Sequence, residues 1–174
     1  MKVIRTQTKH AEILANYFAV NEAHFKPWSP AVPKGHHTVD AWHRRLQDRQ
    51  NEFDRGESVH FIGTDITESH VIGSCSLSNI LRGVFMACHM GYSVAERYEG
   101  QGYARKIVSC AIDYAFKDLK LHRIMANHMP QNDRSAALLK SLGFKREGYA
   151  QSYLLIDGRW EDHVLNSLIN PRQK

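Results

Sequence analysis

The stretch YSVAERYEGQGYARK, residues 92–106, decides the fold of this 174-residue chain. It opens as a strand-like apolar run, breaks around Gly100 and Gly102, and continues as a helical pattern. Glycine lets a ligand approach the backbone closely, and a helix N-terminus offers unpaired N–H groups with a partial positive charge. The pattern therefore predicts an anion-binding loop, flanked by the cations Arg97 and Arg105.

The two glycines have four possible interpretations. A P-loop needs Gly, four residues and then Gly-Lys-Ser/Thr, and the sequence contains no such string. A dinucleotide-binding loop needs a third glycine, where this chain has Arg105, and an acidic residue about 20 positions on, where Lys120 and Leu121 stand. What remains is the pyrophosphate of another cofactor, or a tight turn that needs glycine only for its backbone geometry.

The segments upstream predict helices and then strands. Residues 2–7 are a short candidate strand, residues 10–21 have the apolar spacing of a helix, and Thr38 is an N-cap for a helix to about Arg55. Between these helices, residues 22–37 hold three of the five prolines, which exclude a long helix or a central strand. Residues 58–94 alternate as three strands.

The segments downstream complete an α/β (α+β) fold. The pattern predicts a helix at 102–117, a strand at 122–129, a helix at 132–142, and a hairpin whose strands, 153–156 and 160–168, flank an Asp-Gly turn. We therefore predict a single domain over residues 1–174, in which a mixed central sheet of about seven strands is flanked by about four helices.

Composition is that of an ordinary globular protein, with 43% hydrophobic and 24% charged residues. The formal net charge of +5 suits an anionic cofactor or a nucleic-acid environment. No apolar run reaches the length of a signal peptide core or the ~20 residues of a membrane span. Three scattered cysteines predict reduced thiols in the cytoplasm, and eleven histidines in no metal-ligand spacing predict no metal.

Several strings resemble one enzyme family. The run from Arg97 to Gly102 resembles the Q/R-x-x-G-x-G/A signature of the Gcn5-related N-acetyltransferases (GNAT), and NDRSAALLKSLGFKREG, residues 132–148, is similar to that family's second cofactor element. Residues 122–150, 153–165 and FKPWSP at 25–30 are most similar to ribosomal-protein-alanine N-acetyltransferases of the RimJ and RimL type. The resemblance covers nearly the whole chain in its order of elements.

The resemblance implies a site for acetyl-coenzyme A as co-substrate. The cofactor-side residues that it implies are Tyr92, Ser93, Val94, Arg97, Gly100, Gln101, Gly102, Tyr103, Ala104, Arg105 and Asn132. Asn132 and Ser135 are the implied catalytic residues, with Ser135 near the thiol; the alternative is an N-cap and a first-turn serine. Phe25 and Trp28 are implied to line the acceptor groove; the alternative is that they close the edge of the core.

The implied reaction is direct attack of a neutral amine on a thioester, for which alignment alone supplies about 7–11 kcal/mol. Many members of the family carry a carboxylate and a tyrosine where this chain has Asn127 and Leu139, so their proton-transfer pair is missing here. An α-amine, with a pKa of about 7.7–8.0, needs only a weak base. The base is left open between His89, Glu161, Asp162 and water, with His163 beside them.

The leading hypothesis is transfer to the N-terminal amine, that of an alanine, of a small-subunit ribosomal protein. One alternative is a small-molecule amine acceptor, such as a polyamine or an amino sugar. The other is an assembly factor whose basic surface binds pre-ribosomal particles or rRNA and whose acetyl-transfer activity is secondary. We expect no membrane partner, and a monomer or homodimer.

Overall fold

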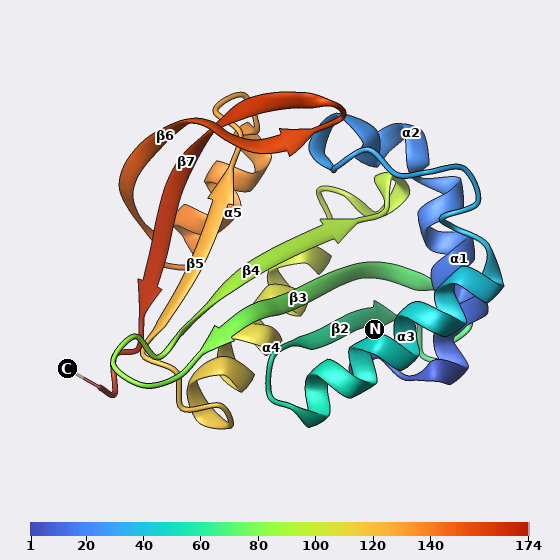
Figure 1. Cartoon of the computed structure of the whole chain (residues 1–174), viewed down its shortest axis with the longest axis horizontal. Coiled ribbons are helices and arrows are strands. Elements are labelled where there is room, and N and C mark those ends of the chain that lie inside the picture. The colour runs from blue at the N-terminus through green and yellow to red at the C-terminus, as the bar shows by residue number, and fades with distance from the viewer. Residues whose placement is uncertain (174) are drawn as a thin grey trace.

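The computed structural model describes residues 1–173 as strands and helices around one mixed sheet (Figure 1). The described strands are β1 (Lys2–Arg5), β2 (Val59–Thr64), β3 (Val71–Leu81), β4 (Ala87–Val94), β5 (Arg123–His128), β6 (Lys145–Ile156) and β7 (Arg159–Ile169). The helices are α1 (Ala11–Val20), α2 (Glu22–Phe25), α3 (Val39–Asp54), α4 (Tyr103–Lys117) and α5 (Asp133–Ser141). Short 3-10 turns are η1 (Thr8–His10), η2 (Lys26–Trp28) and η3 (Glu96–Tyr98).

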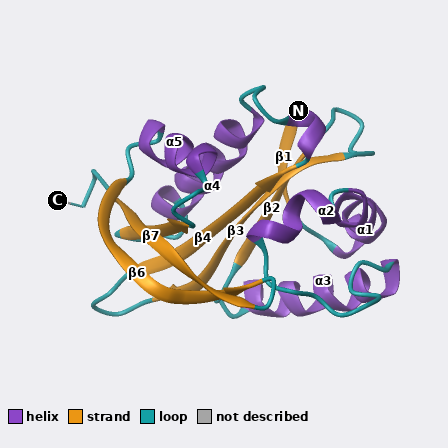
Figure 2. Cartoon of the chain, turned by 90° about the horizontal axis from the view of Figure 1, so that it is seen from above, coloured by secondary structure: helices purple, strands orange, loops and turns teal. Residues whose placement is uncertain are grey.

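The sheet has seven strands in the order β1-β2-β3-β4-β5-β7-β6 within the described chain. Only β4 and β5 pair in parallel; every other neighbouring pair is antiparallel. Helices α4 and α5 cover one face, and α1, α2 and α3 lie on the other (Figure 2). The predicted mixed sheet of about seven strands is confirmed, and the short α2 adds a fifth helix to the predicted four.

Two apolar cores lie on the two faces of the sheet. The apolar stripe of α4, which includes Ile107 and Val108, is fully buried against β2, β3 and β4. A Cβ added to Gly63 on β2 would lie 2.5 Å from Cδ1 of Ile107, so this glycine lets α4 approach the sheet. The second core packs α1 and α3 on the opposite face, around Trp42 and Ile62.

Strands β4 and β5 diverge halfway along β4. Their parallel pairing covers only residues 87–89 of β4 and 123–125 of β5. Beyond this point β4 stays paired with β3 as far as Val94, while β5 stays paired with β7 as far as His128 (Figure 1). The edge of β4 that faces β5 is therefore unpaired from Met90 onward, and its backbone groups need another partner.

Most predicted elements are confirmed, including the Thr38 cap, whose side chain accepts a hydrogen bond from the Ala41 N–H at 3.3 Å. The predicted start of the hairpin at Tyr153 was wrong, because β6 already begins at Lys145. Register shifts interrupt β6 between Arg146 and Gly148 and again before Leu154, so its sequence lacks a regular alternation. No helix in the described residues combines the length and apolarity of a membrane span.

Candidate active site

The glycine loop, residues 97–102, has the geometry of an anion cradle. Gly100 and Gly102 have φ values of +70° and +78°, which side chains with a Cβ rarely adopt. A Cβ added at either position would meet nothing within 4 Å, so the space beside the loop is open. The first backbone hydrogen bond into α4 is donated by Lys106 to the Gly102 carbonyl at 3.3 Å, so the N–H groups ahead of it point out of the helix end.

Three arginines surround the glycine loop. Arg97 stacks over Tyr98, with 4.6 Å from its Cζ to the ring centroid. Arg105 donates to the Ser141 Oγ at 2.7 Å, which ties the start of α4 to the end of α5. Arg134 forms an ion pair with Glu99 in the loop itself. The loop is thus a cationic region that suits a pyrophosphate, as the sequence predicts.

The unpaired edge of β4 leads into this loop, and its side chains alternate between the two faces. Tyr92 packs with the core beneath α4 and α5. Ser93 lies on the other face, where its hydroxyl is 2.9 Å from both the Tyr17 hydroxyl and the Ser74 hydroxyl. The predicted cofactor residues Tyr92, Ser93 and Val94 therefore border the gap between β4 and β5.

Asn132 and Ser135 lie across this gap at the start of α5. The Asn132 Oδ1 accepts a hydrogen bond from the Ser135 N–H at 3.0 Å, so Asn132 is an N-cap. The Ser135 hydroxyl is 2.5 Å from the Tyr92 hydroxyl, which links α5 to β4. Burial raises the pKa of Tyr92 to about 12, despite the opposing effect of the Ser135 hydrogen bond, so this phenol stays protonated at neutral pH. A pair of proton-bearing hydroxyls thus lies at the gap.

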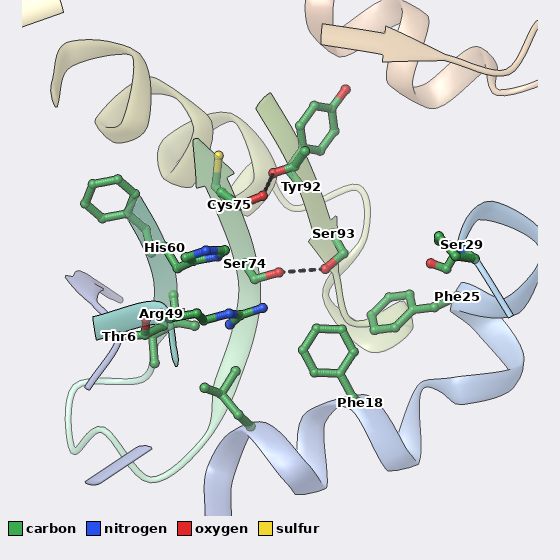
Figure 3. A pocket seen from close by; sticks show the side chains of 16 residues that line it. Thr6, Phe18, Phe25, Ser29, Arg49, His60, Ser74, Cys75, Tyr92 and Ser93 are labelled. Atoms are coloured by element: carbon green, nitrogen blue, oxygen red, sulfur yellow. Dashed lines mark hydrogen bonds between the residues drawn. The ribbon is translucent and has the colours of Figure 1, made fainter. Parts of the chain in front are cut away.

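A cavity of about 340 Å³, here called the β4 cavity, opens beside the unpaired part of β4. Figure 3 shows that its side chains come from α1, α2, α3 and the strands β2, β3 and β4. Its walls are Thr6, Leu14, Phe18, Phe25, Ser29, Pro30, Arg49, His60, Phe61, Ile62, Ser74, Cys75, Ser76, Gly91, Tyr92 and Ser93. Ser29, one of these wall residues, is held to the β6–β7 hairpin turn: its carbonyl accepts a hydrogen bond from the Asp157 N–H at 3.1 Å.

The structure separates the two predicted acceptor residues. Phe25 lines the β4 cavity and is 9% exposed. Trp28 is 40% exposed and does not contribute to the lining. The two roles proposed for Phe25, cavity wall and core edge, coincide, since its ring also packs 5.4 Å from that of Tyr17.

Of the candidate bases, His89 lies where the gap opens, because it forms the last parallel pair between β4 and β5, with Met125. The Asp162 carboxylate accepts from the Tyr149 hydroxyl at 2.6 Å and the Ser152 N–H at 2.8 Å, and these bonds lower its pKa. His89 precedes Tyr92 by three residues, about 10 Å along a strand, and burial lowers its pKa. The backbone carbonyl of Glu161 lies 3.0 Å from the His163 Nδ1, a contact that does not involve the Glu161 carboxylate. The identity of the base stays a prediction.

Sequence reasoning missed two polar residues of the β4 cavity, Arg49 and His60. Burial, and then the charge of Arg49, lower the pKa of His60 to about 3, so this imidazole is neutral at physiological pH. A signal for Arg49 was present: it follows Trp42 by seven residues and Leu46 by three, on the buried face of α3. A cation on an apolar helical stripe marks a position that faces the interior.

No group of three or more His, Cys, Asp or Glu side chains in residues 1–173 is placed to hold a metal ion. The site therefore consists of backbone N–H groups, hydroxyls and cations. These suit an anionic, thiol-bearing ligand, with its phosphates at the glycine loop and its long arm along the open edge of β4.

Known proteins share this arrangement. A family model described as an acetyltransferase (GNAT) domain matches residues 3–145. The ribosomal protein uS5-alanine N-acetyltransferase of Escherichia coli (strain K12) is 44% identical over 159 residues, covering 91% of this chain and 81% of the relative. The crystal structure of ribosomal-protein-S5-alanine acetyltransferase from Vibrio fischeri has a TM-score of 0.95 and 41% identity, covering 99% of this chain and 94% of that one. Mycobacterium smegmatis RimJ in complex with CoA-disulfide has a TM-score of 0.91 and 26% identity, covering 98% and 82%.

Proposed function

Because this chain belongs to the GNAT acetyltransferase family, we propose that it transfers an acetyl group from acetyl-coenzyme A to the α-amine of an N-terminal alanine on a small-subunit ribosomal protein. The E. coli and V. fischeri relatives, which cover most of the chain, are named for this activity. The structural observation that carries the proposal is the β4 cavity, which reaches the unpaired edge of β4 and contains no acidic side chain.

The cofactor fits the residues that the fold brings together. Acetyl-coenzyme A, when bound, supplies a thioester whose carbonyl carbon accepts the amine. In this proposal the N–H groups at the start of α4 and the side chain of Arg97 bind the pyrophosphate. The open edge of β4, at Tyr92 to Val94, hydrogen-bonds the amide groups of the arm, which satisfies backbone groups that β5 leaves unpaired.

Proton transfer to the departing sulfur is assigned to Ser135. As the new C–N bond forms and the C–S bond breaks, the Ser135 hydroxyl delivers its proton to the sulfur. Tyr92, 2.5 Å away, replaces that proton and is itself reprotonated from solvent. Asn132 acts by fixing the first turn of α5 through its bond to the Ser135 N–H.

The amine proton leaves through water in this proposal. About a fifth of an α-amine population is already neutral near pH 7.4, against about one part in a thousand for a lysine amine. A weak acceptor is therefore sufficient for an N-terminal substrate. This accounts for a working site in which Asn127 and Leu139 replace the carboxylate and the tyrosine that many relatives carry.

Of the two rival functions, acetylation of a polyamine fits the cavity less well, and an assembly role does not involve the cavity. A polyamine would bring several positive charges into a cavity whose one charged wall residue is a cation. An assembly factor that binds rRNA through the +5 surface is compatible with the transferase, and a ribosomal substrate places both roles in the cytoplasm.

Mass spectrometry of ribosomal proteins tests the proposal. Ribosomes from cells that lack this chain are incubated with the protein and acetyl-coenzyme A, and each N-terminus is then sequenced. We expect one added acetyl group on the N-terminal alanine of one small-subunit protein. No modification at any N-terminus, with coenzyme binding intact, would reject the proposal in favour of a small amine or an assembly role.

A further inference from the structure

Arg49 is the one charged side chain among the 16 residues that line the β4 cavity. It belongs to α3, and Figure 3 shows its side chain beside Thr6 and below the side chains of His60 and Ser74. Its positive charge contributes to the lowered pKa of His60, which places the two groups close together. The cavity thus has a single cation on its inner wall.

This guanidinium has no anionic partner in residues 1–173. The structure records neither an ion pair nor a hydrogen bond for Arg49 among these residues, and its one specific contact is with Trp42, 5.1 Å from the Cζ to the ring centroid. Its neighbour one turn earlier, Arg45, also stacks on Trp42 but donates to the His36 ring and to the His36 carbonyl at 2.9 and 3.0 Å. Arg49 is therefore without a hydrogen-bonded counter-ion among these residues, although the charge of Glu52, three positions on, opposes the effect of burial on its pKa.

Such an arrangement is costly unless a ligand uses it. A partly buried cation loses hydration, and the charge of Glu52 offsets only part of that loss, so a bound counter-charge would stabilise Arg49 further. Burial lowers the pKa of Arg49 to about 10, and the group is still charged at neutral pH. A planar guanidinium matches a carboxylate with two parallel hydrogen bonds, which is the strongest neutral-pH partner that a peptide can offer.

We propose that Arg49 binds a carboxylate of the acceptor, supplied by an acidic side chain within residues 2–4 of the acetylated N-terminus. This inference rests on the proposed function and names the feature that selects its substrate. The amine must reach β4, and β2 lies two strand spacings away, about 10 Å. An extended peptide advances about 3.3 Å per residue, so its third or fourth residue reaches the position of Arg49.

Synthetic acceptors test this assignment. The peptides begin with alanine, end in an amide, contain no lysine, and carry glutamate at position 2, 3 or 4, each with a glutamine counterpart. Thiol release and product mass give kcat/KM. For at least one position we expect the glutamate peptide to exceed its counterpart by about tenfold or more, mainly through KM, since a hydrogen bond to a charged group is worth that factor.

Matched variants show whether Arg49 causes the preference. We expect Arg49→Gln to reduce the glutamate-to-glutamine ratio to about one, while Arg45→Gln, on the same helix and the same tryptophan, leaves the ratio unchanged. Arg49→Glu should instead favour a peptide with arginine at the preferred position. Unchanged coenzyme A affinity by calorimetry shows that each variant is folded.

Four results would overturn the assignment. Equal kcat/KM for glutamate and glutamine peptides at all positions, or a preference that survives Arg49→Gln, rejects the role of Arg49 while leaving N-terminal transfer in place. Acetylation of free L-alanine in preference to the amidated peptides assigns the bound carboxylate to an amino acid and rejects the peptide. No product from any of these amines, with coenzyme A bound, rejects the proposed function together with this inference.

Discussion

The glycine loop and the β4 cavity both border the C-terminal half of β4, and they are built in different ways. The glycine loop is one continuous segment, and the groups that we propose to contact the ligand are mainly backbone N–H groups at the start of α4. The β4 cavity is assembled from residues on three helices, three strands and the segments that connect them, up to 87 positions apart, from Thr6 to Ser93. A backbone site is thus a local property of the chain, whereas a side-chain cavity exists only after folding.

This difference explains how the two sites respond to mutation. In the glycine loop, side-chain identity matters at the two glycines, which allow a positive φ and an open approach, and at Arg97, which supplies a charge. In the cavity, each side chain contributes its own shape or charge, and Arg49 alone contributes a charge. Loss of one glycine should therefore abolish binding of the donor, while single changes in the cavity should alter the acceptor that is used.

The largest effect is expected for Gly102→Glu. Its φ of +78° is unfavourable for glutamate, and the new carboxylate would lie against the pyrophosphate. We expect coenzyme A affinity, measured by calorimetry, to fall by more than about 100-fold. The matched control is Gly56→Glu after α3, where φ is +72° and the added Cβ is equally free. Equal affinity in the two variants would reject the cofactor assignment of the glycine loop.

A smaller effect is expected at Ser135, which contacts Tyr92 of β4. Ser135→Ala should lower kcat by about 10–100-fold with little change in coenzyme affinity, the range usual for a proton-transfer group. Because Tyr92 is bonded to Ser135 at 2.5 Å, Tyr92→Phe should lower kcat as well, and the double variant should be no slower than Ser135→Ala alone. Ser109→Ala on α4 is the control for loss of a hydroxyl. A fully active Ser135→Ala enzyme would show that Ser135 has only a structural role in the first turn of α5.

The sequence predicts the parts of this molecule that depend on local pattern. The helix α4, the Thr38 cap and the glycine loop follow from periodicity and residue type over a few turns. The catalytic roles expected of Asn132 and Ser135 came from family resemblance; the structure confirms the alternative, that Asn132 is an N-cap, and adds the link from Ser135 to Tyr92. That link joins residues 43 positions apart, which no local pattern encodes.

What the sequence did not predict depends on tertiary structure or on broken periodicity. The first half of β6 escaped prediction because two register shifts remove its alternation. The cavity escaped prediction because its wall combines Phe25, Arg49 and His60 from separate elements. Arg49 was also missed, but it could have been found, because the sequence places this cation on the apolar stripe of Trp42 and Leu46.

His60 offers a test of the cavity that does not depend on any ligand. Its folded-state pKa is about 3, below the ordinary value of 6.5, so the unfolded chain binds more protons between these two values. The contribution of neutral His60 to stability is therefore complete above pH 6.5 and is lost as the pH falls toward 3.

We expect the wild-type protein to lose about 2 kcal/mol more unfolding free energy between pH 7 and pH 5 than His60→Gln, from urea titrations at both values. His43→Gln, at an exposed position on α3, should follow the wild type. Parallel losses in the wild type and His60→Gln would show that His60 is hydrated in solution and that the inner wall of the cavity is open.

The smallest effect is expected at Cys75, the thiol in the wall of the β4 cavity. Cys75 is 1% exposed, and burial raises its pKa well above the ordinary range, so it carries almost no thiolate at neutral pH. Burial likewise raises the pKa of Cys88 to about 12, whereas Cys110 is exposed. Iodoacetamide at pH 8 should therefore modify Cys110 alone and leave activity intact, and Cys75→Ala should keep kcat within about threefold of the wild type. An acetyl group on Cys75, detected by intact mass after mixing the enzyme with acetyl-coenzyme A alone, would instead make the cavity wall a covalent carrier and replace direct amine attack by a two-step transfer.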